Sequence, residues 1–372
     1  MSEADSTAPA ALPEMHKPVL RKEVAALWQA YFRPDLDEKP LSAVQPSMVP
    51  GPGHKPGNKY REPAPCPSIR PDLPQNGQLL YVDATLGEAG HARLLLEQQP
   101  QAQLLGIDAD PQMLGRARHF LDAALGSEQR QQRCRFVERR FSDYFCSLDP
   151  GLLQADMILF DLGISLFHYN SEAARGFSFR PEDPEELLDM RLNPAQGQSA
   201  AELLQTLSEA ELADILYSYG ELRNSRRLAR LIVAQRDNME LHKAQVLAHF
   251  LRQINPTARP GKKKQNGKHN KGNKAKIHPA TQVFQALRIA VGDELGQLKS
   301  GLPAALEQLR TYGLLAVITF HSLEDRLVKQ QFRDWQDQGR VQWVYKKTIQ
   351  ASHDSPLPSE RSAKLRVVRR MD

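Results

Sequence analysis

Short apolar runs alternate with amphipathic stretches along most of the chain. Most of the first five runs are continuously apolar, which is typical of parallel strands that helices cover on both faces. The last two runs alternate between apolar and polar residues and are separated only by a loop, so we predict an antiparallel pair at one edge of the sheet. This pattern predicts an α/β fold with a doubly wound sheet. The predicted strands are residues 79–83, 104–108, 135–138, 157–161, 314–320, 341–346 and 365–369.

Residues 172–278 depart from this alternation of strands and helices, because they show helical patterns and no convincing strand. The stretches 199–202 and 208–211 both read Ser-x-x-Glu ahead of apolar repeats, which is the pattern of a helix capping box. We therefore predict that helices are inserted after the fourth strand. The predicted domains are a sheet domain of residues 16–171 and 279–372 and an inserted all-helical domain of residues 172–278.

Three segments are predicted to lack regular structure: residues 259–276 have no large apolar side chain, and the prolines of residues 33–78 fix φ and remove backbone donors. We predict a disordered tail at residues 1–15, and a long Pro- and Gly-rich surface loop at residues 33–78 after a short helix at 20–31. Residues 259–276 hold eight Lys or Arg side chains and no acidic one, so this loop accounts for the net charge of +5. This loop either binds nucleic-acid phosphates or is an insertion that only increases solubility.

The composition argues against several classes of protein. Three cysteines without CxxC spacing indicate neither a disulfide framework nor a zinc site, and we expect no metal. No run approaches the roughly 18 apolar residues that a membrane span needs, so we expect no membrane partner. The N-terminal stretch contains acidic residues and lacks an apolar core, which argues against a secretory or mitochondrial signal. These features predict a cytoplasmic protein.

The first predicted strand leads into a loop, DATLGEAGH, with the features of a ligand site. Gly87 and Gly90 permit a tight turn at the carboxyl edge of the sheet, where doubly wound folds bind ligands. The loop lacks the GxGxxG of dinucleotide sites, and Asp83 and Glu88 would repel a pyrophosphate, so a nicotinamide enzyme is disfavoured. A cationic ligand fits better, and S-adenosylmethionine carries a sulfonium and an ammonium. Asp108, 21 residues after Gly87, can accept hydrogen bonds from both ribose hydroxyls; the alternative is two capped strand ends.

Two further strand ends carry candidate catalytic groups. Asp161, with the carbonyls of Leu162 and Gly163, could accept hydrogen bonds from an amine and orient its lone pair toward a methyl donor. Alternatively, Asp161 only caps the following turn. His321 ends the fifth strand on the same rim of the sheet and could act as a hydrogen-bond partner or proton acceptor. The alternative is a structural histidine beside a helix that Ser322 caps.

Basic side chains gather at two other places. One group recurs at helical spacing in the predicted helical domain, so its members share one helix face. Such a face is usually only solvated, yet together with the lysine loop it could form a wall of an RNA groove. The second group, near the C-terminus, could contact RNA phosphates or, on an edge strand, prevent association. The two groups are Arg223, Arg226, Arg227 and Arg230, and Arg361, Lys364 and Arg366.

A series of short motifs resembles the bacterial 16S ribosomal RNA cytosine-N4 methyltransferases (RsmH, also called MraW). In chain order they are HKPVLRKEV, DATLGEAGH, GIDADP, DLGIS, ARGFSF, LDMRL, GQSAAELL, YGE, HPATQVFQALRIAV, TFHSLEDRLVK and RSAKLR. The resemblance covers the chain from His16 to the C-terminus apart from the two low-order loops. It implies a class I (Rossmann-like) methyltransferase sheet interrupted by a helical domain.

The resemblance also implies roles for individual residues. It places Asp108 on the ribose of S-adenosylmethionine and Phe141 near the adenine. Glu88 stands where the family commonly has an arginine, Leu166 where it has a serine, and His168 where it usually has a glutamine. Together with the first loop, the candidate cofactor-binding residues are Asp83, Gly87, Ala89, Gly90, His91, Asp108, Phe141, Asp161 and His168. The catalytic candidates are Asp161, Ser165 and His321.

These observations predict an S-adenosylmethionine-dependent enzyme that methylates the N4 amine of a cytosine in 16S ribosomal RNA. The resemblance implies a cytosine of the decoding region. The target base would have to leave its stack to present N4. The expected partner is 16S rRNA or the small ribosomal subunit, and the expected oligomeric state is a monomer or a homodimer. The alternatives are a methyltransferase of another RNA, a protein or a small molecule, and a non-catalytic RNA-binding protein.

Overall fold

A computed structural model describes most of the chain. The described residues are 18–32, 79–169, 175–179, 184–254, 279–345, 347–351 and 360–372. The predicted tail at 1–15, the Pro- and Gly-rich loop at 33–78 and the lysine loop at 259–276 lie outside them. The predicted domain boundaries at residues 172 and 278 also lie outside them, so the division into domains stays a prediction.

An eight-stranded sheet forms the centre of the molecule, in the order β3-β2-β1-β4-β5-β8-β6, with β7 also paired to β8. The strands from β3 to β5 run parallel, and β8 runs antiparallel to β5, β6 and β7. The strand order reverses at β1, which has β2 on one side and β4 on the other. The strands are β1 (Leu79–Asp83), β2 (Ala102–Asp108), β3 (Cys134–Glu138), β4 (Ala155–Asp161), β5 (Leu309–Thr319), β6 (Val341–Trp343), β7 (Ile349–Gln350) and β8 (Lys364–Arg370).

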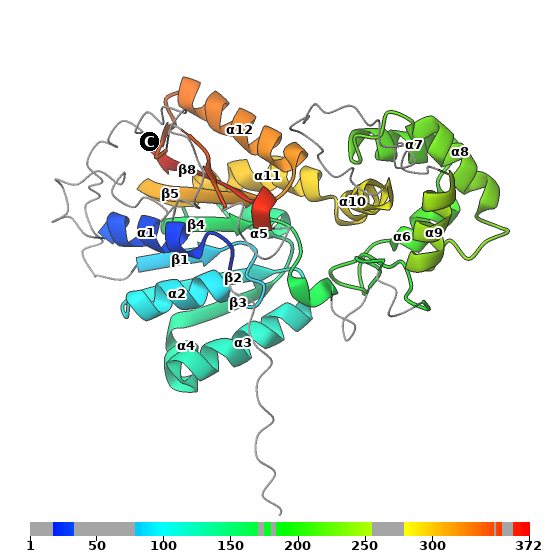
Figure 1. Cartoon of the computed structure of the whole chain (residues 1–372). Coiled ribbons are helices and arrows are strands. Elements are labelled where there is room, and N and C mark those ends of the chain that lie inside the picture. The colour runs from blue at the N-terminus through cyan, green and yellow to red at the C-terminus, as the bar shows by residue number, and fades with distance from the viewer. Residues whose placement is uncertain are drawn as a thin grey trace, which may run out of the picture.

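Helices cover both faces of this sheet (Figure 1). On β4, Met157 and Leu159 belong to one core and Ile158 and Phe160 to the other, which explains the continuously apolar run. The first core takes side chains from α1 (Arg21–Phe32), α2 (Gly90–Gln98) and α3 (Pro111–Leu125), and the second from α5 (Phe141–Cys146), α11 (Glu294–Glu307) and α12 (Ser322–Asp337). The short helix α4 (Ser127–Arg133) follows α3. The predicted α/β fold with a doubly wound sheet is confirmed.

Four helices after β4 lie to one side of the sheet and enclose a hydrophobic core of their own (Figure 1). They are α6 (Ala200–Thr206), α7 (Glu209–Ser218), α8 (Ser225–Gln235) and α9 (Ala244–Ile254). Both predicted capping boxes are present, at the starts of α6 and α7. The following helix, α10 (Pro279–Gly292), adds Val283, Phe284 and Leu287 to this core and so joins the four helices to the sheet region.

Two details of the sheet differ from the prediction. The last two predicted strands do pair antiparallel, but β8 lies between β5 and β6 and is therefore no edge strand. The side chains of Leu365, Val367 and Val368 are buried, because β8 has a strand on each side and contributes to both cores. The two-residue strand β7 was missed, since two residues are too short for a periodic signal. Within the described residues, no helix is long and apolar enough to cross a membrane.

Candidate active site

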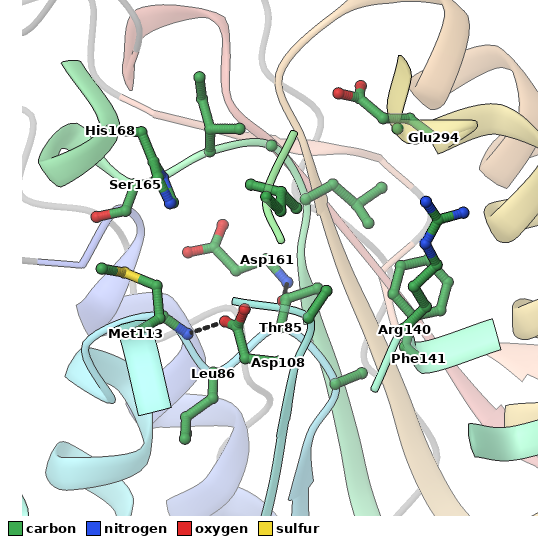
Figure 2. A pocket seen from close by; sticks show the side chains of 18 of the residues that line it. Thr85, Leu86, Asp108, Met113, Arg140, Phe141, Asp161, Ser165, His168 and Glu294 are labelled. Atoms are coloured by element: carbon green, nitrogen blue, oxygen red, sulfur yellow. Dashed lines mark hydrogen bonds between the residues drawn. The ribbon is translucent and has the colours of Figure 1, made fainter. Parts of the chain in front are cut away.

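A cavity of about 320 Å³ opens at the carboxyl ends of β1, β2 and β4, where the strand order reverses. In the view of Figure 2, Asp161 lies near the middle, with Ser165 and His168 on one side and Glu294 on the other. Nine predicted site residues line the cavity: Asp83, Gly87, Gly90, His91, Asp108, Phe141, Asp161, Ser165 and His168. Ala89 and His321 do not line it, although both lie next to residues that do.

The first loop is shaped by its backbone and by Asp108. The Gly87 N–H donates to Oδ2 of Asp108 at 2.8 Å, and the Asp110 N–H donates to Oδ1 at 2.8 Å. Burial raises the pKa of Asp108, although these two donors oppose the shift. Gly87 has a φ of 53° and Ala89 a φ of 64°, so both occupy the left-handed region that favours glycine. Ala89 therefore shapes the start of α2 through its backbone rather than through its side chain.

A group of two carboxylates and one imidazole forms the floor of the cavity, with Asp83 and His91 buried and Asp161 half-buried. Asp83 is 2% exposed and accepts hydrogen bonds from the Tyr81 hydroxyl at 3.1 Å and the Thr85 N–H at 3.3 Å. His91 Nε2 lies 3.6 Å from Oδ2 of Asp161. Burial raises the pKa of Asp83 to about 7; His91 opposes this shift and the charge of Asp161 adds to it. The group is negatively charged above that pH and suits a cationic ligand.

Several polar atoms at this floor have no hydrogen-bond partner within the described part of the chain. They are both ring nitrogens of His91, Oδ1 of Asp161 and Nδ1 of His168. Buried polar atoms are nearly always bonded in native proteins, so such a set beside a cavity indicates groups that a ligand satisfies. The backbone of Asp161 is fixed by its N–H, which donates to the Thr85 hydroxyl at 2.7 Å.

Glu88 and Ser165 have structural contacts that the sequence did not reveal. The carboxylate of Glu88 pairs with the Arg116 guanidinium of α3 at 2.6 Å. Arg116 in turn stacks over the Phe167 ring at 4.3 Å, which holds the short helix η3 (Leu166–Tyr169) against α3. The Ser165 hydroxyl accepts the Phe167 N–H at 3.2 Å, so this side chain caps η3 at the cavity wall.

His321 belongs to an ion-pair network beside the cavity. Its Nε2 lies 3.1 Å from Glu324 and 3.9 Å from Glu294, and the Arg288 guanidinium bonds Glu294 at 2.8 Å. Burial lowers the pKa of His321, but Glu294 and Glu324 outweigh it and raise that pKa to about 9. The two carboxylates face Nε2, which is therefore a hydrogen-bond donor, while Nδ1 accepts the Glu324 N–H. This argues against its acting as a proton acceptor and favours an electrostatic or structural role.

The same cluster has ligand atoms close enough to hold a metal. Ligand atoms of Glu294, His321 and Glu324 lie within 4.8 Å of one another. However, Arg288 bonds both carboxylate oxygens of Glu294, and Glu324 accepts the backbone N–H groups of Phe320 and His321. A guanidinium at one corner repels a cation, so we interpret the cluster as an ion-pair network.

The C-terminal basic residues are only partly available for RNA. Asp325 bonds Lys364 Nζ at 2.9 Å and Arg366 Nε at 2.8 Å, and Arg366 is 9% exposed. These two side chains therefore hold β8 against α12. By contrast, Arg226 and Arg230 on α8 are exposed.

Sequence reasoning missed four residues that shape this site: Asp110, Arg175, Arg288 and Glu294. Asp110 had a local signal, because an Asp directly before a proline is a good helix N-cap, and it does cap α3. Arg175 lies in the ARGFSF motif, which was noted without a role. Nothing local marks Arg288 or Glu294, because their meeting depends on how α10 and α11 are placed.

The comparisons with known proteins now identify the family. The model of the MraW methylase family matches residues 15–371. The chain belongs to this family. This MraW-family chain is 39% identical over 321 residues to the ribosomal RNA small subunit methyltransferase H of Treponema denticola, covering 82% of this chain and 94% of that one. The protein of the same name from a Cyanothece strain is 42% identical over 294 residues, covering 78% and 88%.

Proposed function

We propose that this protein transfers a methyl group from S-adenosylmethionine to the N4 amine of a cytosine in small-subunit ribosomal RNA. The observation that carries the proposal is the acidic, incompletely hydrogen-bonded floor of the cavity around Asp161. The names of the relatives, which are ribosomal RNA small subunit methyltransferases, support the substrate class. The cytosine, its N4 amine and its decoding-region position rest on the family resemblance of the motifs.

The residues of the cavity fit this cofactor. Asp108 is held by two backbone donors and can still accept hydrogen bonds from ribose hydroxyls with its remaining lone pairs. Phe141 lies on the cavity wall, with its ring edge-on to Phe160 at 5.1 Å, and offers an apolar contact for an adenine. The carboxylates of Asp83 and Asp161 suit the ammonium and the sulfonium. When bound, the cofactor supplies an electrophilic methyl group, so the protein has to supply orientation and charge.

Asp161 is the residue that we assign to the amine. Its Oδ1 is buried without a hydrogen-bond partner in the described part of the chain, and it lies at the cavity floor. An exocyclic amine that donates to this oxygen has its lone pair turned away from the carboxylate, so its attack direction is fixed. Because an amine conjugated to a base is a weak nucleophile, this orientation accounts for much of the expected rate.

The most direct test maps methylated cytosines in ribosomal RNA by mass spectrometry, in cells with and without the gene. We expect one cytosine of the small-subunit RNA to lose an N4-methyl group when the gene is absent and to regain it on complementation. Unchanged methylation would refute the rRNA assignment. A protein or small-molecule methyltransferase would leave this map unchanged while still consuming S-adenosylmethionine.

Asp161→Asn tests the assigned residue. We expect the variant to fold and bind S-adenosylhomocysteine, and to lose methyl transfer by about 100-fold or more, since that is the usual contribution of such a group. Asp214→Asn, an exposed aspartate on α7, is the matched control and should retain wild-type turnover. Normal turnover by Asp161→Asn would show that another group orients the amine.

A further inference from the structure

Asp110 joins three segments of the chain with one buried carboxylate. It is 0% exposed, and its Oδ1 accepts the Gln112 N–H at 2.8 Å as the N-cap of α3. Its Oδ2 lies 2.9 Å from His168 Nε2 and 3.0 Å from Arg175 Nη1. The start of α3, the helix η3 and the segment 175–179 therefore share a single anion.

Arg175 contacts residues 189–192 beside the cavity through both its side chain and its backbone. Its guanidinium, 9% exposed, donates to the carbonyl oxygens of Arg191 and Leu192 and to Gln112 Oε1. Its own carbonyl oxygen accepts the N–H groups of Asp189 at 3.1 Å and Met190 at 2.7 Å. Met190, Arg191 and Leu192 line the cavity. The position of this wall thus depends on Arg175.

The same contacts continue in two directions. Toward the cofactor, the Asp110 N–H donates to Asp108, the predicted ribose ligand. Toward the helices after β4, the carbonyl oxygen of Asp189 accepts the Ala200 N–H at 2.8 Å, at the first residue of α6. A continuous chain of hydrogen bonds therefore links the Asp108 carboxylate to the start of α6.

A buried ion pair of this kind is weak evidence for stability, because desolvating the two charges offsets their attraction. Its effect is geometric, since a planar guanidinium with several acceptors admits one arrangement of its neighbours. Asp110 keeps its charge despite burial: desolvation would raise its pKa, but His168, the Gln112 N–H and Arg175 lower it. The pair therefore persists across the neutral range.

We propose that Arg175, which is paired with the Asp110 carboxylate, is a positioning residue. It couples cofactor binding to the position of residues 189–192 beside the cavity. Through these residues it also affects the position of α6. Arg175 does not have to touch the cofactor for this role. It acts through Asp110, which contacts Asp108 and His168, and through Met190, Arg191 and Leu192, which line the cavity. The inference rests on the proposed function for the identity of the cofactor. It does not depend on which RNA is the substrate.

Arg175→Gln tests the coupling with the whole chain and S-adenosylhomocysteine as the probe. We expect the Kd from calorimetry to rise about 10-fold or more, which is within the usual range of coupling between sites. In wild-type protein the ligand should slow amide hydrogen exchange at residues 187–193. In Arg175→Gln this protection should be lost, while protection of the first loop at 85–91 remains.

Arg133→Gln is the matched control, because Arg133 also binds three carbonyl oxygens, those of Leu96, Gln99 and Ala102, away from the cavity. Its loss should lower the melting temperature without changing the Kd or the protection at 187–193. If Arg175→Gln does not fold, Asp110→Asn replaces it, since an amide can keep the helix cap but not the ion pair. It too should weaken binding and lose the protection.

The outcomes separate this inference from the proposed function. A folded Arg175→Gln or Asp110→Asn variant with the wild-type Kd and the wild-type protection would refute the coupling role of Arg175. The cofactor assignment would stay intact. Failure of the wild-type protein to bind S-adenosylhomocysteine would refute the cofactor assignment. It would also refute the coupling role of Arg175, which depends on that assignment. Arg175→Lys should bind with intermediate affinity, because an ammonium keeps the charge but reaches fewer of the acceptors.

Discussion

At the scale of single residues, burial changes what a carboxyl group does. Asp83 and Asp108 both end parallel strands, with Asp83 buried and Asp108 half-buried, yet their partners differ. Asp108 accepts two backbone N–H groups and is held in one orientation. Asp83 accepts one hydroxyl and one N–H and faces the charge of Asp161, so burial and repulsion together raise its pKa to about 7. Its charge therefore changes near physiological pH.

This shift predicts a pH dependence of cofactor binding. The carboxyl of Asp83 is neutral below about pH 7 and attracts a cation only when ionised above it. We expect affinity for S-adenosylmethionine to be about tenfold weaker at pH 6 than well above pH 7, since about a tenth of the molecules are then ionised. Calorimetry across this range would measure it. Asp83→Asn should bind weakly with a flatter profile, and an equally steep profile in that variant would show that the pH dependence comes from a group other than Asp83.

At the scale of elements, local chemistry sets where helices begin. The capping boxes of α6 and α7 were predicted from Ser-x-x-Glu alone, and the structure shows both reciprocal hydrogen bonds in each. His321 makes an equivalent box with Glu324 at the start of α12. The alternative interpretation of the sequence, a structural His321 beside a helix capped by Ser322, placed the cap one residue too late. An imidazole nitrogen accepts the Glu324 N–H in place of a hydroxyl.

Ser208→Ala tests the contribution of a cap to the helices after β4. The Ser208 hydroxyl accepts the Glu211 N–H at 3.3 Å at the start of α7. Its removal should lower the free energy of unfolding by about 1 kcal/mol, which is typical of an N-cap. Urea unfolding would measure this, with Ser218→Ala at the other end of α7 as the control. Equal stability of the two variants would show that tertiary packing alone fixes the start of α7.

At the scale of the whole molecule, the acidic cavity and the basic helix face are separate features. The net charge of the chain says little about either, because the lysine loop dominates it. Arg226 and Arg230 are exposed on α8, whereas Arg227 donates to the carbonyl oxygen of Ile254. The arrangement suits an RNA whose backbone contacts the helices α6 to α9 while one base enters the cavity.

The arginine face predicts a salt dependence of RNA binding. A double variant, Arg226→Ala with Arg230→Ala, should weaken RNA binding and reduce the slope of log affinity against log salt by about 1.4 to 1.8, because each phosphate contact contributes about 0.7 to 0.9. Binding of S-adenosylhomocysteine should not change. Arg333→Ala, exposed on α12, is the control. An unchanged slope in the double variant would mean that this face is only solvated.

The sequence alone predicted the parallel strands, the capped starts of α6 and α7, and the acidic strand ends at the floor of the site. Continuous apolar runs predicted the parallel strands, since most of these strands are buried on both faces, and strand ends such as Asp83, Asp108 and Asp161 then had to meet at one edge of the sheet. What only the tertiary structure decided was which distant groups meet: Arg175 with Asp110, Arg288 with Glu294, and β8 between β5 and β6. Periodicity reports which side of an element is buried, and it carries no information about the partner, because pairing across the fold depends on the three-dimensional placement of the whole chain.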